Sequence, residues 1–388
     1  MEIVLTTNSP GEVAGWVRPM VRQLRADWPE ARISLFVLPC AFASGRECLV
    51  ASEIEGIRQV FSPRDYWRLA LWGKKPAGFQ PGPRGLVLFL GGDQTHAVII
   101  GRRLGYPVFI YTEGRALWPR AVKRYFVPYP QALRRAEEVA PGQVELVGNL
   151  MLDAIRTTTD RESYRAKLKV GRDEQLIALF PGSRPAEFRY AISFFQQTIA
   201  RIAAARTDCR FVLCLSPFIA PELAAELWTA TNLQVPMIQG EQYEIMQAAD
   251  LAITIPGTNN VEMAFFGLPM VVALPLDRPE LIPLEGLPGL VGDLPLIGPK
   301  IKAYAVKKLA ARYKYTALTN VIAQRMVVPE VRGEITPADV AHEVLNLLAD
   351  PRRRHRMSAD LREVVGATGA AQRIVATLKK FTGQEDEL

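Results

Sequence analysis

The stretch that decides the fold is IPGTNNVEMAFFGLPMVVALPL, residues 255–276. It reads as the end of an apolar strand, a glycine turn, a polar triplet, one glutamate, a short apolar helix and a second strand. A polar helix start between two apolar strands is typical of a βαβ unit, in which ligands bind at the carboxyl end of the first strand.

Composition places the chain among globular proteins. It has 388 residues, of which 49% are hydrophobic and 22% charged, so we expect two or three domains. Cys40, Cys48, Cys209 and Cys214 form no C-x-x-C pair, which favours reduced core thiols over zinc or disulfides. No run of 18 apolar residues occurs and no basic segment precedes the first strand, so we expect neither a spanning helix nor a signal peptide.

The net charge of +7 suits nucleic acid, an anionic membrane or a phosphorylated substrate, and equally a uniformly solvated basic surface. No aromatic RNP stretch or zinc-finger spacing is present, so we expect no nucleic-acid partner.

Short apolar runs alternate with helical stretches along the whole chain. In the first 150 residues the predicted strands are EIVLTT, RISLFVLP, GLVLFLGG, YPVFIYTE, YFVPYP and VELVGN, with helices at 17–28 and 94–104. A polar linker and helix are predicted at 156–175, after which LIALFPG, RFVLCLS, VPMIQG, LAITIPG and PMVVALPL read as strands. Residues 336–348 and 351–380 read as helical. Such alternation predicts parallel sheets.

The pattern therefore predicts an α/β protein with two Rossmann-like, doubly wound parallel-sheet domains and an interdomain cleft, although no G-x-G-x-x-G fingerprint occurs. We place the first domain at 1–155 and the second at 170–360. The C-terminal helix, 365–388, is expected to pack back onto the first domain.

In the opening stretch, Gly257 is expected to supply a tight turn that a ligand can approach closely. Thr258 and Asn259 lie at a helix start, where free N–H groups favour an anion. Glu262, in the first turn, would accept hydrogen bonds from sugar hydroxyls. A phosphate site followed by a diol receptor describes a nucleotide-sugar site. The alternative is that Thr258 and Asn259 only cap the helix, while Glu262 favours its dipole.

A similar loop, FPGSRPAEF, lies at 180–188. Gly182 and Ser183 would offer donors, and the guanidinium of Arg184 suits a diphosphate. An ordinary strand–helix turn with a surface arginine is the alternative.

The stretch LFLGGDQTHA, 88–97, ends a strand in the first domain. Asp93 follows two glycines, where a carboxylate would act as general base on an acceptor hydroxyl, and His96 lies three residues on. The alternatives are a helix N-cap for Asp93 and a satisfied, partly buried imidazole for His96.

Two further loops of the first domain offer polar groups for an acceptor. NSPGEVAG supplies Ser9, Gly11 and Glu12, and YTEGRALWPR supplies Glu113, Arg115 and Arg120.

The segment DYWRLALWGKKPAG, 65–78, interleaves aromatic and cationic residues, as a membrane interface requires. The patch consists of Trp67, Arg68, Leu71, Trp72, Lys74 and Lys75. The alternative is a core-packed helix whose lysines reach out to solvent.

Taken together, these motifs resemble the lipid-A-disaccharide synthase family. The resemblance covers most of the chain and is strongest at 176–345, in LFPGSRPAEF, ADLAITIPGTNNVEMAFFGLPMVV and ALTNVIAQRMVVPEVRGEITPADVA. In the first domain, SPGEVAGW, GGDQTHA and WPRAVKRY are similar to its Gly-Glu-Ala-Ser-Gly-Asp loop, its catalytic aspartate and its Trp-Arg-Pro-Gly-Arg segment.

The resemblance implies an inverting GT-B glycosyltransferase that moves an N-acetylglucosamine-type sugar from a UDP-sugar to a lipid-linked or phosphorylated sugar. Asp93 would be the base, and Asn320 and Arg325 would line the donor side. No metal or other cofactor is expected beyond the UDP-sugar substrate, since no Asp-x-Asp motif occurs. The expected partners are an acyl-sugar or lipid-linked acceptor and the inner face of the cytoplasmic membrane, with a homodimer as one option.

The chain departs from the family at Ala14, Gly15 and Trp16, which replace Ser-Gly-Asp, and in residues 276–312. A divergent branch with another acceptor is therefore one alternative. A UDP-sugar 2-epimerase of the same fold and a non-catalytic nucleotide-sugar- or lipid-binding relative are the others.

Overall fold

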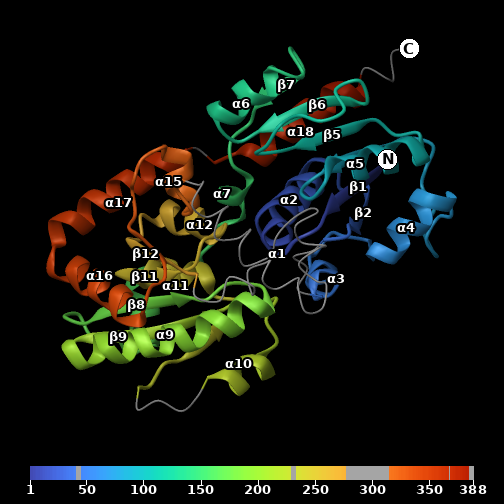
Figure 1. Ribbon diagram of the computed structural model, residues 1–388. Helices are drawn as coiled ribbons and strands as arrows, with labels where there is room; N and C mark the ends of the chain where they lie inside the picture. The colour runs from blue at the N-terminus through green and yellow to red at the C-terminus, as the bar shows by residue number, and fades with distance from the viewer. Residues whose placement is uncertain (41–44, 229–232, 277–313, 367, 384–388) are drawn as a thin grey trace. The chain divides into compact units, whose positions relative to one another are not determined.

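The computed structural model describes residues 1–40, 45–228, 233–276, 314–366 and 368–383, so the predicted departure at 276–312 lies almost wholly outside the described residues. The chain divides into two compact units, coloured by residue number in Figure 1. Unit 1 comprises Met1–Ala154 and Gly366–Leu388, and unit 2 comprises Ile155–Val365. Each unit is built on its own parallel sheet.

In its described residues, unit 1 has a seven-stranded sheet with the order β3-β2-β1-β4-β5-β6-β7. Every pair of neighbouring strands is parallel. The strands are β1 (Glu2–Thr7), β2 (Arg32–Val37), β3 (Gln59–Phe61), β4 (Gly85–Phe89), β5 (Val108–Tyr111), β6 (Val122–Val127) and β7 (Val144–Leu146). The strand order reverses between β1 and β4, which makes their carboxyl ends the topological switch point.

Helices follow the strands of unit 1, as parallel connections require. They are α1 (Pro10–Glu12), the π-helical turn η1 (Val13–Val17), α2 (Arg18–Asp27), α3 (Glu47–Ser52), α4 (Pro63–Trp72), α5 (Gln94–Leu104), α6 (Pro130–Glu137), α7 (Leu150–Ala154) and α18 (Ala370–Gly383). The helix predicted at 17–28 thus begins earlier than expected, and its first turns are not regular α-helix. A short π segment of this kind is frequent at functional sites.

Unit 2 repeats the arrangement with a sheet that has, among the described strands, the order β10-β9-β8-β11-β12-β13, again all parallel. The strands are β8 (Gln175–Phe180), β9 (Cys209–Leu215), β10 (Met237–Gln239), β11 (Leu251–Thr254), β12 (Met270–Pro275) and β13 (Glu330–Gly333). The order reverses between β8 and β11, so this pair marks the second switch point. The predicted doubly wound, parallel-sheet fold class is confirmed.

The helices of unit 2 are α8 (Arg161–Lys167), α9 (Pro185–Ala205), α10 (Pro221–Leu227), α11 (Gln242–Ala248), α12 (Asn259–Phe266), α15 (Leu318–Ala323), α16 (Pro337–Ala349) and α17 (Pro351–Val365). Their apolar faces bury residues such as Phe188, Phe195 and Ile199 of α9 against the unit's core. Burial of this kind, rather than helix propensity, supplies most of the stability of such helices.

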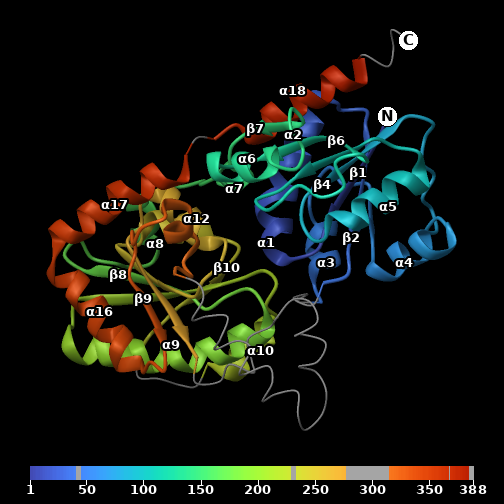
Figure 2. The ribbon, with the colours of Figure 1, turned by 45° about the horizontal axis from the view of Figure 1, so that its top comes forward.

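The helical stretch predicted at 351–380 is wrong as a single element. It forms two helices, α17 and α18, separated around Gly366 (φ +76°) and Gly369 (φ +90°). Such φ values end a right-handed helix, and glycine adopts them without steric cost. Beyond the break, the Asp153 carboxylate accepts hydrogen bonds from the N–H groups of Gly369 and Ala371 at 2.5 and 2.8 Å. Figures 1 and 2 show α18 running beside elements of unit 1.

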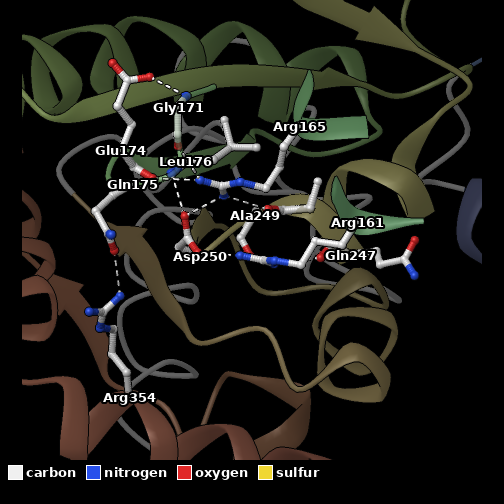
Figure 3. Close-up of polar contacts among 11 residues, drawn as sticks. Arg161, Arg165, Gly171, Glu174, Gln175, Leu176, Gln247, Ala249, Asp250 and Arg354 are labelled. Carbon is white, nitrogen blue, oxygen red and sulfur yellow. Dashed lines mark hydrogen bonds and ion pairs between the residues drawn. The ribbon is translucent and has the colours of Figure 1, made fainter. Parts of the chain in front are cut away.

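A buried ion-pair network fixes the start of unit 2 (Figure 3). Asp250, just before β11, binds Arg161 and Arg165 of α8 at 2.5 and 2.8 Å. Its Oδ2 also accepts the N–H of Leu176 in β8 at 2.8 Å. Because one carboxylate joins α8, β8 and β11, the linker helix is held against the strands that carry the switch point.

No helix in the described part of the chain is both long and apolar enough to cross a membrane.

Candidate functional site

At the switch point of unit 2, the loops after β8 and β11 touch. Gly182 has φ +104°, and a Cβ there would lie 2.7 Å from Ile255 Cδ1. Only glycine fits such a backbone and such a neighbour, so the two loops form one surface. We also expected Gly257 to adopt a backbone conformation that favours glycine. That prediction is wrong, because the φ of Gly257 lies outside the left-handed region. Gly257 is exposed and still lets a ligand approach the backbone.

The polar triplet after Gly257 is ordered by β11. Asn259 Nδ2 donates to the Thr254 hydroxyl at 3.1 Å, and Asn260 Nδ2 donates to the Ile255 carbonyl at 3.2 Å. Thr258 is the N-cap residue of α12, but its side chain makes no capping hydrogen bond. The capping alternative for Thr258 therefore lacks its expected contact. The N–H groups of Asn260 and Val261 in this first turn donate to the Gly257 and Thr258 carbonyls at 3.2 and 3.0 Å.

Arg184 and Glu262 flank this surface from the two loops. Arg184, the N-cap residue of α9, pairs with Glu187 at 2.7 Å. Glu262 lies in the first turn of α12 and accepts the Tyr243 hydroxyl at 2.9 Å through Oε1. Ser183 is half-buried beside them. The two touching loops thus lead into two helix starts, one with a guanidinium and one with a carboxylate, a combination that suits a diphosphate and a diol.

Asn320 and Arg325 have well-defined partners within unit 2. Asn320 is fully buried; its amide donates to the Val328 carbonyl and accepts the Val327 and Val328 N–H groups at 2.7–2.9 Å. Arg325 forms a two-point ion pair with Asp360 at 3.0 and 3.1 Å. These contacts explain both residues as structural, and a contact with the donor stays a prediction.

At the switch point of unit 1, the loops after β1 and β4 touch in the same way. Gly91 and Gly92 have φ of +125° and +99°. Added Cβ atoms would lie 2.6 Å from Glu12 Cγ and 3.0 Å from Asn8 Cγ, respectively. The glycines thus let the GGD loop lie directly against the loop that carries Ser9, Gly11 and Glu12.

Asp93 is exposed and is the N-cap residue of α5, where its Oδ1 accepts the Thr95 N–H at 2.8 Å. Partial burial acts to raise the pKa of Asp93, but hydrogen bonds from Thr95 and the charge of His96 outweigh it and hold the pKa below its usual range. Asp93 is therefore an ionised carboxylate at neutral pH. The capping alternative is correct, and the carboxylate is still exposed to solvent, where it can accept a proton or hydrogen bond.

His96 has a partner that sequence analysis missed. Its Nδ1 lies 2.6 Å from the hydroxyl of Tyr66 in α4, and its ring makes edge contacts with Tyr66 and Trp67. Burial lowers the pKa of His96, partly opposed by the charge of Asp93. No sequence signal joins two residues 30 positions apart in this way.

Glu113, two residues beyond β5, is the most perturbed carboxyl group of unit 1. Burial, and then the nearby Glu12 carboxylate, raise its pKa from 4.5 to about 7. Its Oε1 is buried and has no hydrogen-bond partner among the described residues. Carboxyl groups with such a pKa suit acid–base chemistry and cluster at functional sites.

The other predicted acceptor residues lie at different depths. Ser9 is buried, Gly11 is half-buried, and Arg115 and Arg120 are exposed. Gln94, not anticipated from sequence, is buried behind them and bonds the Arg115 carbonyl and the Leu117 N–H at 2.9 Å each. The 113–120 loop is thus fixed to the start of α5.

The predicted membrane patch lies on α4 and the residues after it. All six side chains are exposed; Leu71 is 57% and Trp72 65% accessible, while Tyr66 and Leu69 of the same helix are buried. The core-packed alternative therefore holds only for one face of α4. Its other face presents aromatic and aliphatic groups beside Arg68, Lys74 and Lys75 to solvent.

Among the described residues, no group of three or more His, Cys, Asp or Glu side chains is arranged to hold a metal ion.

The two parallel sheets with glycine-lined loops at their switch points define the GT-B class of fold. Solved structures with this fold align over nearly the whole chain. A putative UDP-N-acetylglucosamine 2-epimerase from Listeria monocytogenes aligns with TM-score 0.58 and 16% identity, over 99% of this chain and 97% of that one. Acinetobacter baumannii MurG aligns with TM-score 0.51 and 13% identity, over 98% and 99%.

Sequence comparison finds similarity to lipid-A-disaccharide synthases. Residues 137–278 match the family model described as lipid-A-disaccharide synthetase. The lipid-A-disaccharide synthase of Geobacter sulfurreducens is 27% identical over 270 residues, 69% of this chain and 64% of that protein. That of Anaeromyxobacter sp. (strain K) is 31% identical over 219 residues, 55% and 51%. The predicted relationship to the lipid-A-disaccharide synthase family is confirmed, and the matches span about half to two thirds of these relatives' length.

Proposed function

We propose that this protein is an inverting glycosyltransferase that moves an N-acetylglucosamine-type sugar from a UDP-sugar to a lipid-linked or phosphorylated sugar acceptor. The observation that carries the proposal is the joined loop surface of unit 2. There the Gly182 turn meets Ile255 in the loop before α12, and Arg184 and Glu262 lie at the helix starts that follow the two loops. The family relationship supports the same reaction.

In unit 2, the donor diphosphate would lie over the starts of α9 and α12, with Ser183, Arg184, Thr258 and Asn259 as its donors. Helix-start N–H groups and a guanidinium neutralise the charge that develops on departing UDP, the usual electrostatic share of such catalysis. The carboxylate of Glu262 would accept the ribose hydroxyls. This arrangement needs no metal ion, and that expectation stays part of the proposal.

In unit 1, Asp93 would take the proton from the acceptor hydroxyl as its oxygen attacks the anomeric carbon. The bond to the UDP oxygen breaks on the opposite face, which inverts the anomeric configuration. Asp93 is ionised and exposed at the switch point, as a general base must be. Glu12, Glu113, Arg115 and Arg120 would contact the acceptor, and the exposed patch on α4 would bind an anionic membrane surface.

The test is UDP release from UDP-N-acetylglucosamine with a panel of acyl-sugar and lipid-linked acceptors. Asp93→Asn keeps the N-cap acceptor but not the base, so we expect kcat to fall at least about a hundredfold with UDP binding unchanged. Asp160→Asn is the matched control, because Asp160 is likewise an exposed N-cap carboxylate, accepting the Ser163 N–H at 3.0 Å. Unaltered turnover in Asp93→Asn would refute the assigned base, and absence of release with every acceptor would refute the transferase.

A UDP-sugar 2-epimerase is the second candidate, favoured by one observation. Glu12, Asp93 and Glu113 place three carboxyl groups at the strand ends of unit 1, and proton removal next to an anomeric carbon needs such groups. An epimerase needs no acceptor. Formation of a second isomer from UDP-N-acetylglucosamine alone would favour this candidate and exclude the transferase, whereas UDP binding without either reaction would favour a non-catalytic relative.

A further inference from the structure

Helices α4 and α5 are joined at two points. Near the start of α5, His96 Nδ1 meets the Tyr66 hydroxyl at 2.6 Å. Near its end, Arg103 donates to the Ala70 carbonyl of α4 through Nε and Nη2, at 3.2 and 2.7 Å. The N-terminus of α4 is itself closed by a capping box between Ser62 and Asp65. Because both ends of the contact are fixed, the Tyr66 hydroxyl has one position relative to the His96 ring.

The direction of the Tyr66–His96 hydrogen bond follows from burial. Tyr66 is fully buried, and burial, with the charge of Asp93, raises its pKa to about 12, so the hydroxyl keeps its proton. A buried hydroxyl proton left without an acceptor costs about 1–3 kcal/mol. Among the described residues, the partner within reach of that proton is His96 Nδ1. Tyr66 therefore donates, Nδ1 is unprotonated, and the ring hydrogen of the neutral imidazole lies on Nε2.

The Nε2 atom of His96 is differently placed. It makes no hydrogen bond among the described residues. A buried atom without a partner would be among the buried unsatisfied polar atoms, and Nε2 is not, so it is accessible to solvent. His96 and Asp93 share the first turn of α5, where the His96 N–H donates to the Asp93 carbonyl at 3.1 Å. An accessible N–H donor thus lies within one helical turn of the proposed base.

We propose that Tyr66 is a positioning residue that holds His96 as the Nε2–H tautomer, so that His96 donates a hydrogen bond to a substrate oxygen while Asp93 accepts the proton. This inference rests on the proposed function for its substrate. It gives His96 the role of a neutral hydrogen-bond donor rather than that of an acid or base. The oxygen that suits an uncharged donor beside a carboxylate is a sugar hydroxyl, since a phosphate there would be repelled by Asp93.

The first experiment needs no substrate. Nitrogen-15 NMR of the imidazoles at neutral pH is readable because the chain has only three histidines, and His342 and His355 are exposed and serve as internal references. We expect His96 to show a protonated Nε2 and an unprotonated Nδ1, and Tyr66→Phe to convert it to a mixture of tautomers. Tyr106→Phe is the matched control: Tyr106 is in the same core, and its hydroxyl donates to the Gly82 carbonyl instead. A protonated Nδ1 in the unaltered protein, or a tautomer unmoved in Tyr66→Phe, would overturn the proposal.

The second experiment separates positioning from a merely structural hydrogen bond. We expect Tyr66→Phe to lower kcat about tenfold with an unchanged KM for the UDP-sugar, the loss of about one hydrogen bond in the transition state. His96→Gln keeps an N–H donor near the Nε2 position but cannot respond to Tyr66. Adding Tyr66→Phe to His96→Gln should therefore cost nothing further, because Tyr66 acts only through His96. Additive losses would refute the positioning role. Absence of turnover in the unaltered protein would refute the proposed function and leave the tautomer result standing.

Discussion

The Glu113→Gln substitution tests the buried carboxyl group of unit 1. The folded pKa of Glu113 is about 7, raised from 4.5 first by burial and then by Glu12. Between these two pH values the folded protein binds more protons than the unfolded chain, so the free energy of unfolding falls as the pH rises. At about 1.4 kcal/mol per pH unit, ionised Glu113 costs unit 1 about 3 kcal/mol above pH 7. Glutamine has nearly the same shape and cannot ionise.

We therefore expect Glu113→Gln to match the unaltered protein within about 1 kcal/mol at pH 4.5 and to exceed its stability by up to about 3 kcal/mol at pH 8. Because the chain has two units, the assay must report unit 1 alone. Five of the six tryptophans lie in unit 1, and Trp228 is the exception. Urea unfolding followed by tryptophan fluorescence in a Trp228→Phe background isolates that unit.

Two further variants make the Glu113 test decisive. Glu138→Gln makes the same chemical change at an exposed carboxyl group of unit 1 and should leave the pH dependence intact. Glu12→Gln removes the neighbouring charge and lowers the folded pKa of Glu113, so the loss of stability should end at a lower pH and be smaller. If the stability curves of Glu113→Gln and the unaltered protein run parallel from pH 4.5 to 8, Glu113 does not titrate in that range and the reasoning fails.

Three other substitutions follow from the structure. Gly182→Ala places a methyl group 2.7 Å from Ile255 Cδ1 at φ +104°. The free energy of unfolding, measured by thermal unfolding, should fall by about 1–3 kcal/mol, and calorimetry should show weaker UDP binding. Normal values of both would contradict the joined-loop surface. Asp250→Asn leaves the buried Arg165 without its ion pair and should lower the free energy of unfolding of unit 2 by about 3 kcal/mol in urea. Lys167→Met removes an exposed ion pair and should lower it by less than about 1 kcal/mol. Equal losses in the two variants would be contrary evidence. Trp72→Ala should weaken binding to anionic vesicles about tenfold in a sedimentation assay. Leu146→Ala, at an exposed position outside the patch, should leave vesicle binding unchanged. Unchanged binding of Trp72→Ala would exclude the patch as a membrane contact.

The sequence predicts those elements whose signals are local. The helix expected at 94–104 is α5 to the residue, because Asp93 caps its start and Gly105 ends it with φ +73°. The missed strands, β3 and β13, have only three and four residues and lie at the sheet edges. Half-exposed edge strands of this length carry too few apolar residues to show a pattern.

The features that could not be predicted depend on tertiary contacts. Glu113 has an ordinary sequence context, and its raised pKa arises from burial and from Glu12, about 100 positions away in the chain. The Tyr66–His96 hydrogen bond likewise joins two helices. The break between α17 and α18 is different, because the sequence itself contains Gly366 and Gly369. Two glycines three positions apart should have divided the helical stretch.

The two switch points share a backbone feature but carry side chains of opposite charge. In each unit, glycines at positive φ let two strand-end loops touch. In unit 2 the loops present Arg184 and the starts of α9 and α12, which favour anions. In unit 1 they present Glu12, Asp93 and Glu113, which repel anions. On the proposed function, the diphosphate would therefore bind unit 2 and an uncharged group would meet the strand ends of unit 1.

This division bears on the acceptor. Any phosphate it carries would lie away from Glu12 and Glu113, toward the exposed guanidinium groups of Arg115 and Arg120 on the neighbouring loop. The hydroxyl that attacks would then be the part of the acceptor nearest Asp93. On the proposed function, Arg115 and Arg120 would distinguish phosphorylated from neutral acceptors, whereas the carboxyl groups would select the hydroxyl that reacts.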